Sequence, residues 1–208
     1  MNYYLLFYFL LIIFFEIKIP KYKNIHLSSL LHSSIVGITT NYLLINDYDK
    51  FINIYKYNFE DLNSLYYYTP YYSLIFSFVD IYESFKMNDK VFILHGLMML
   101  FTCIVSLYNN LNHYLTSALI LEVSTIFYNF VSLNNDIINI IFFILFLFYR
   151  NILFSMMSIN YMKYYYENSL YGSMSHNLII PPIIIFNSLN FFWGQKIIRK
   201  MVRLSKKL

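Results

Sequence analysis

The sequence predicts an all-α integral membrane protein, a polytopic bundle of about seven transmembrane helices within a range of six to eight. Hydrophobic residues make up 59% of the 208 residues and charged residues only 12%, whereas soluble domains carry about 25% charged residues. The mean hydropathy is +0.50. So little polar surface can coexist with a folded chain if lipid covers the apolar side chains. The hydrophobic residues also gather in runs, and the length of each run is close to the ~20 residues that a helix needs to cross ~30 Å of hydrocarbon.

Residues 2–15 form an apolar run that we interpret as a first transmembrane helix. A signal peptide is the alternative. No basic residue precedes the run, however, and the polar stretch 16–20 follows it in place of a small-residue cleavage site. A retained helix is therefore the favoured interpretation.

The other predicted spans differ in polarity. Residues 27–46 form a more polar one, whose hydroxyls can bond helical carbonyls, and 47–68 follow as a charged loop that can include a short surface helix. Further apolar runs cover residues 69–85, 91–108, 111–133, 137–159 and 178–198, and residues 160–177 are predicted to be a polar loop. Pro70 and the Pro181–Pro182 pair stand near the starts of spans, where a missing N–H costs least.

The basic residues are distributed unevenly across these seven spans. Eleven of the fifteen lie on the side of the C-terminus and three on the opposite side. Positive charge favours the cytosolic side, so the C-terminus is predicted to be cytosolic and the N-terminus lumenal or outside. The predicted organisation is a helix with a basic loop over 1–26, a membrane domain over 27–200 and a basic cytosolic tail over 201–208.

Four ionisable residues lie inside predicted spans, and they are Asp80, His95, Glu122 and Arg150. An ionised group at the centre of a membrane costs ~2.5–3.5 kcal/mol, so each is a candidate functional residue. Glu122 is expected to be protonated or paired, and its helical face also holds Thr125 and Asn129. Arg150 is expected to need an acidic partner, for which Asp80 and Glu122 are available. Hydrogen bonding between helices is the structural alternative for each.

Several other features bear on function. His32 is expected to form hydrogen bonds, Asn187 and Asn190 to join helices, and Trp193 to anchor a helix at the interface. The sequence has no phosphate-binding glycine loop, no zinc-type Cys/His spacing and no nucleophile elbow, so we predict no cofactor and no metal. The basic tail follows a membrane helix, so nucleic acid is not an expected partner.

The order of these polar residues resembles that of the TLC domain family of membrane proteins, which includes the ceramide synthases. Residues 121–129, LEVSTIFYN, resemble the family's helix with Glu, a hydrophobic residue, Ser-Thr, Phe and Asn. The other matching segments, in the family's order, are Leu31 to Ser33, Tyr71 to Asp80, Lys90 to His95, Phe142 to Arg150 and Leu189 to Ile197. The resemblance spans about residues 27–200.

The resemblance implies a protein that binds, senses or moves lipid in an internal membrane such as the endoplasmic reticulum. Membrane lipids would be its partners, and the implied lipid-binding residues are Asp80, His95, Glu122, Asn129 and Arg150. Sphingoid-base N-acyl transfer is one alternative, with His95, Asp80 and Glu122 as the catalytic candidates. Ceramide synthases carry a double histidine, which Gly96 breaks here, and this weighs against an enzyme. A proton or ion pathway is a further alternative, because buried acidic and basic groups also form such pathways.

Overall fold

The computed structural model describes residues 3–18, 21–22, 25–133 and 135–205. The described part is an all-α bundle with one small antiparallel hairpin, formed by β1 (Lys21–Tyr22) and β2 (Ile25–His26). A helix lies at each of the seven predicted spans, which confirms the predicted fold class.

Five of the seven helices are single elements and two are composite. The single helices are α1 (Tyr3–Lys18), α2 (Leu27–Asn46), α4 (Ser64–Lys86), α5 (Lys90–Tyr108) and α10 (Met174–Ser205). One composite helix joins α6 (Asn112–Ala118), η3 (Leu119–Leu121) and α7 (Glu122–Tyr128), and the other joins α8 (Asp136–Phe146), the π-helix η5 (Leu147–Leu153) and α9 (Phe154–Glu167). Short connecting helices are α3 (Tyr48–Ile52), η1 (Ile54–Lys56), η2 (Phe59–Asp61), η4 (Val131–Leu133) and η6 (Leu170–Gly172).

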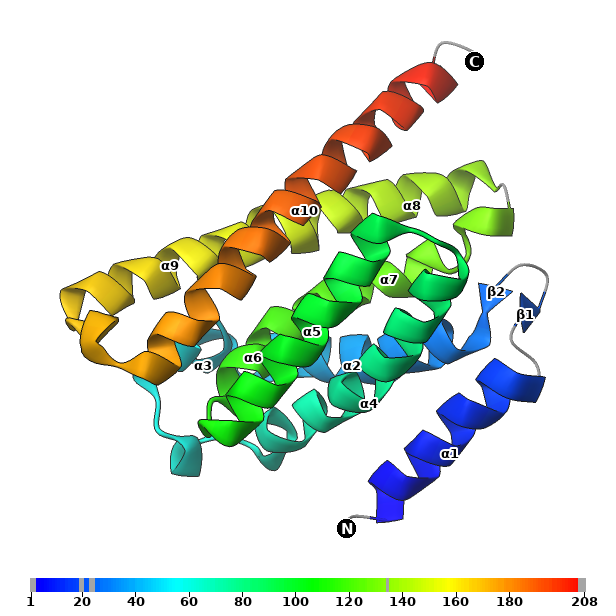
Figure 1. The fold of residues 1–208 in the computed structure, drawn as a ribbon. Coiled ribbons are helices and arrows are strands. Elements are labelled where there is room, and N and C mark those ends of the chain that lie inside the picture. Colours follow the sequence, from blue (N-terminus) through cyan, green and yellow to red (C-terminus); the bar gives the residue numbers. More distant parts are fainter. Residues whose placement is uncertain (1–2, 19–20, 23–24, 134, 206–208) are drawn as a thin grey trace.

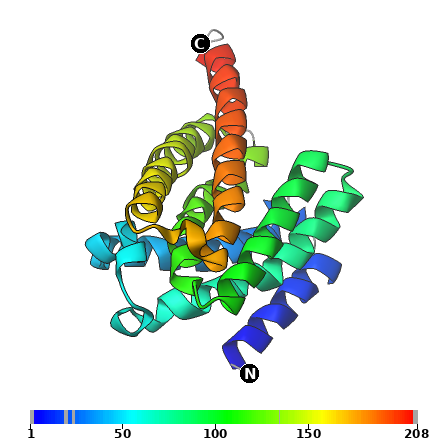
Figure 2. The ribbon, with the colours of Figure 1, turned by 60° about the vertical axis from the view of Figure 1, so that its left-hand side comes forward.

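The long helices run between two ends of the bundle (Figure 1). One end holds the hairpin, the connections from α4 to α5 and from α7 to α8, and the C-terminal part of α10. The opposite end holds the start of α1 and the connections from α5 to α6 and from α9 to α10 (Figures 1 and 2). The C-terminal part of α10 projects beyond the rest of the bundle in both views.

In the described part of the chain, four helices are long and apolar enough to cross a membrane, judged by length and composition. They cover Lys90–Tyr108, Asn112–Leu133, Asp136–Glu167 and Met174–Arg203, and Tyr3–Ile17 is a shorter apolar helix. The helices α2 and α4, with 20 and 23 residues, are long enough but more polar. The chain is thus a multi-pass membrane protein, and the count of seven spans stays a prediction.

Three predicted boundaries differ from the structure. The charged segment 47–68 contains α3, η1 and η2 as well as the start of α4, and several of its apolar side chains are buried in the core. Helix α9 continues to Glu167, so residues 160–167 are helical and not a loop. Helix α10 continues through the predicted tail to Ser205, while residues 206–208 lie outside the described part.

Short polar side chains determine where several helices begin. Asn63 accepts a hydrogen bond from the backbone N–H of Leu65 at the start of α4. Asp89 and Asn135 each accept two backbone N–H bonds at the starts of α5 and α8. Such caps satisfy donors that the first helical turn leaves free.

Helices α2 and α7 approach most closely at Gly37. A Cβ atom at this position would lie 3.0 Å from the Val123 nitrogen and 3.1 Å from the Glu122 carbonyl carbon. Both are backbone atoms, which cannot move without displacing α7. Gly37 therefore permits the contact that fixes Glu122 against α2, as small residues do between membrane helices.

We expect Gly37→Val to lower the free energy of unfolding by about 1–3 kcal/mol, because overpacking forces the two backbones apart. The matched control is Gly172→Ala, since a Cβ there meets no atom within 4 Å. Thermal unfolding of the detergent-purified variants measures the difference. Equal midpoints for the two variants would contradict the assigned role of Gly37.

Candidate functional site

A polar cavity of about 320 Å³ lies among the helices of the bundle. Four predicted site residues line it, each from a different element: Asp80 from α4, His95 from α5, Glu122 from α7 and Arg150 from η5. The remaining lining residues are Ser29, Phe76, Phe92, Ser124, Thr125, Tyr128, Phe142, Phe146, Trp193, Lys196 and Ile197. Residues far apart in the sequence thus converge on one cavity, which we call the polar cavity.

Asp80 and His95 form a pair across α4 and α5. The distance from His95 Nδ1 to Asp80 Oδ2 is 3.2 Å. Gly96 makes this pair possible, because a Cβ at that position would lie 3.1 Å from Asp80 Oδ2 and 2.8 Å from Ile81 Cγ1. The position that carries a second histidine in ceramide synthases is therefore closed by α4 in this chain.

Arg150 is buried and hydrogen-bonded to uncharged groups. Its Nε donates to Ser124 Oγ at 2.8 Å and its Nη2 to Thr125 Oγ1 at 2.8 Å. Its Nη1 donates to Asn190 Oδ1 at 3.4 Å, and Asn190 Nδ2 donates back to the Arg150 carbonyl oxygen. The expected ion pair with Asp80 or Glu122 is not among the ion pairs of the described residues.

The π-helix η5 shapes the backbone around Arg150. Such wide turns occur often at functional sites. On the adjacent helix α10, Gly194 faces this segment, and a Cβ there would collide with the Asn151 amide nitrogen. The close approach brings Asn190 within reach of Arg150.

Glu122 is buried and lies within electrostatic range of Arg150, His95 and Asp80. Its carboxyl group therefore joins the two charged parts of the cavity, the Asp80–His95 pair and the guanidinium. This arrangement places two acidic and two basic groups around one small volume.

Other predicted residues lie away from the polar cavity. Asn129 donates to Ser33 Oγ and to the Thr125 carbonyl oxygen, so it joins α7 to α2. His32 is buried, where Tyr8 and the stacked ring of Phe76 contact it. Asn187 bonds to two serines of α9, as expected of a residue that joins helices.

The sequence did not single out Lys196, Ser124 or Tyr128, and it assigned Trp193 only to the interface. One signal was available, because Trp193 and Lys196 are three residues apart on one helix and thus lie on the same side of it. Among the described residues, no group of three or more His, Cys, Asp or Glu side chains could hold a metal ion.

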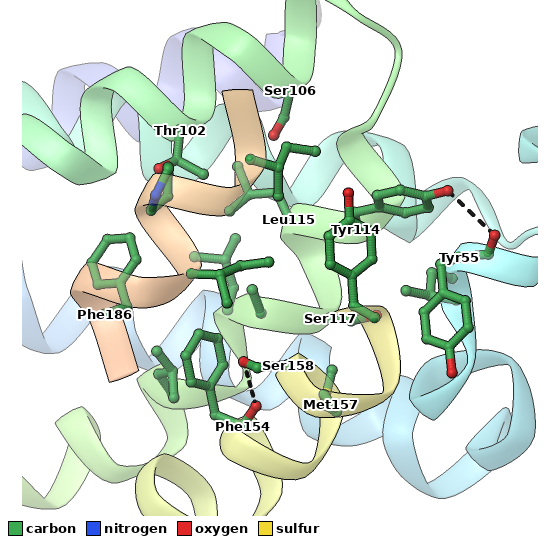
Figure 3. Close-up of a pocket in the computed structure, with 18 of the residues that line it drawn as sticks. Tyr55, Thr102, Ser106, Tyr114, Leu115, Ser117, Phe154, Met157, Ser158 and Phe186 are labelled. Atoms are coloured by element: carbon green, nitrogen blue, oxygen red, sulfur yellow. Dashed lines mark hydrogen bonds between the residues drawn. The ribbon is translucent and has the colours of Figure 1, made fainter. Parts of the chain in front are cut away.

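A second, apolar cavity of about 90 Å³ lies among α5, α6, α9 and α10 (Figure 3). Phe186 lines it beside Leu115 and Phe154, and the hydroxyls of Thr102 and Ser106 lie at one side. The ring of Phe186 also packs edge-on against His95, with centroids 5.6 Å apart. Phe186 therefore stands between the two cavities.

We expect Arg150→Lys to lower the free energy of unfolding by about 2 kcal/mol, because an ammonium group cannot replace the guanidinium bonds to α7 and α10 together. The matched control is Arg199→Lys, an exposed position on α10. Unfolding in detergent, followed by circular dichroism, measures the difference. A loss no larger than that of the control would contradict the importance of these bonds.

Comparison with protein-family models matched the TLC domain over residues 23–199. Comparison with curated proteins and with solved structures found no significant match. The matched segment begins at the hairpin, covers every residue of the polar cavity and ends within α10. The resemblance inferred from the sequence is confirmed, and the chain belongs to the TLC domain family.

Proposed function

We propose that this protein binds a membrane lipid, with the polar end of the lipid in the polar cavity. The observation that carries the proposal is the convergence of Asp80, His95, Glu122 and Arg150 on one volume of about 320 Å³. Ligand cavities begin at about 300 Å³ and combine apolar walls with a few converging polar groups. The phenylalanines and Trp193 supply such walls here.

Energetics support a ligand role over a purely structural one. Each ionisable group inside a bilayer costs about 2.5–3.5 kcal/mol, and helix packing needs only small or uncharged residues. The chain uses such residues elsewhere, since Asn187 and Asn129 join helices with neutral hydrogen bonds. Charged groups gathered on a cavity are better explained by a polar ligand that they contact.

The apolar cavity suits a hydrocarbon chain of the same lipid. Its walls are mainly aliphatic and aromatic, and Phe186, one of its lining residues, packs against His95. A rotation of this ring would connect the two cavities. A lipid with its headgroup at His95 could then place part of one chain beyond Phe186.

We also propose an orientation and a membrane. The end of the bundle that holds the C-terminal part of α10 would face the cytosol, because the basic residues favour that side. The endoplasmic reticulum is the membrane that the family implies. The same end lies closest to Lys196, so a ligand would enter from the cytosolic leaflet.

Acyl transfer is a second candidate function, favoured by the Asp80–His95 pair. If His95 Nδ1–H donates a hydrogen bond to Asp80, the other ring nitrogen is free to take a proton from the attacking amine and to give it to the thiolate that leaves the acyl thioester. Asp80 would orient the ring and stabilise its protonated form. The closed position of Gly96 removes the second histidine of the ceramide synthases, so lipid binding remains our first proposal.

We expect a defined lipid to co-purify with the wild-type protein and to be lost from Glu122→Gln and His95→Ala, because both variants remove cavity groups. Mass spectrometry of the detergent-purified protein measures the bound lipid. The matched control is Glu167→Gln, an exposed position on α9, which should keep the lipid. Only bulk lipid in all four proteins would contradict the proposal.

If the chain transfers acyl groups, His95→Ala should lower the rate by about 10²–10⁴-fold, the usual contribution of a general base. Asp80→Asn should also lower the rate, and the Glu167→Gln control should not. The assay follows transfer from an acyl-thioester to a long-chain amine. Absence of product from the wild-type protein in reconstituted membranes would exclude this second candidate.

A further inference from the structure

One basic residue of the polar cavity lies apart from its other ionisable groups. Asp80 lies 3.2 Å from His95, and Glu122 lies within electrostatic range of Arg150. Lys196 is the remaining charged residue of the lining, and it takes part in none of the ion pairs of the described residues. Its Nζ lies 4.2 Å over the Phe192 ring, one turn earlier on α10.

Lys196 stands at the rim of the cavity. Its side chain is exposed, and it follows Trp193 by three residues on α10. The Trp193 ring stacks on Phe92 at 5.5 Å and packs against His95 at 5.6 Å. Trp193 thus contacts His95 inside the cavity, and Lys196 lies on the exposed stretch of α10 that follows it.

Further basic residues follow Lys196 along α10. Beyond Lys196, the exposed residues Arg199, Lys200 and Arg203 continue the basic character of α10. The acidic side chains at the same end of the bundle include Asp89, which caps α5, Glu83, which pairs with Lys86 at 3.4 Å, and Asp136 at the start of α8. A run of basic residues raises the local concentration of anions.

We propose that the ligand of the polar cavity is a membrane lipid whose phosphate-bearing headgroup has a net negative charge, and that Lys196 binds this phosphate at the rim. The inference rests on the lipid-binding function proposed above and names the class of lipid. A lysine ammonium binds phosphate as a point charge, without a fixed geometry. The inner groups would contact the uncharged polar part of the lipid.

The experiment uses Trp193, the single tryptophan of the sequence and part of the cavity wall. The full chain in detergent micelles is titrated with phosphatidic acid or phosphatidylcholine that carries brominated acyl chains, which quench tryptophan. For wild type we expect half-quenching by phosphatidic acid at a concentration about fivefold lower than by phosphatidylcholine. This is the difference expected for one lysine that faces an anionic headgroup. Added salt should reduce this preference.

Three variants separate the role of Lys196 from general charge. Lys196→Gln should raise the half-quenching concentration of phosphatidic acid more than that of phosphatidylcholine, and so bring the ratio of the two values close to one. Lys196→Arg should keep the preference. Arg203→Gln, an exposed position of the same helix outside the cavity, should also keep it, and an equal loss in both glutamine variants would overturn the assignment to Lys196.

The remaining outcomes distinguish this inference from the function on which it rests. Saturable quenching by both lipids with no preference would overturn the anionic headgroup and leave the lipid site standing. No saturable quenching by either lipid would contradict the lipid site itself. Inorganic phosphate is added as a competitor, and its displacement of phosphatidic acid from wild type at equal concentration would assign the rim to free phosphate instead.

Discussion

A guanidinium buried among membrane helices needs partners for its N–H groups, because lipid offers none. Arg150 meets this requirement through Ser124 and Thr125 of α7 and Asn190 of α10. These bonds tie the π-helix η5 to two other helices at one depth of the bundle. The polar cavity lies directly beside them, so its shape depends on how this one side chain is satisfied.

Close backbone contacts complete the cavity from the opposite side. Gly37 lets α2 pack against the backbone at Glu122, and Gly96 lets α5 pack against Asp80. In both places a methyl group would separate helices that carry a cavity residue. Two small residues thus position two acidic groups, while hydrogen bonds position the Arg150 guanidinium.

The sequence predicted the positions of the helices well because hydropathy is a local property of the chain. It also identified Asp80, His95, Glu122 and Arg150, since a charge inside an apolar run is visible without a structure. The partners of these residues depend on how each helix is rotated and packed, which no single run reveals. Arg150 donates its hydrogen bonds to neutral oxygens, while Glu122, one of its two predicted acidic partners, lies within electrostatic range without a close ion pair among the described residues. Asn129, seven residues after Glu122, contacts Ser33 of α2 instead of the cavity. The loop predicted over 160–177 failed for another reason, because residues 160–167 are polar enough to leave a membrane yet still continue α9.

The composite helix from Asp136 to Glu167 has 32 residues. At a rise of about 1.5 Å per residue it is about 48 Å long, whereas the hydrocarbon core of a bilayer is about 30 Å thick. Tilts of membrane helices range up to about 40°, and such a tilt cannot absorb the whole difference. The last turns of α9, with the exposed Lys163–Glu167 pair, must therefore extend beyond the hydrocarbon core. Because the same rod carries Arg150, a thicker or thinner bilayer that changes its tilt also changes the depth of the guanidinium, and this links hydrophobic mismatch to the geometry of the cavity.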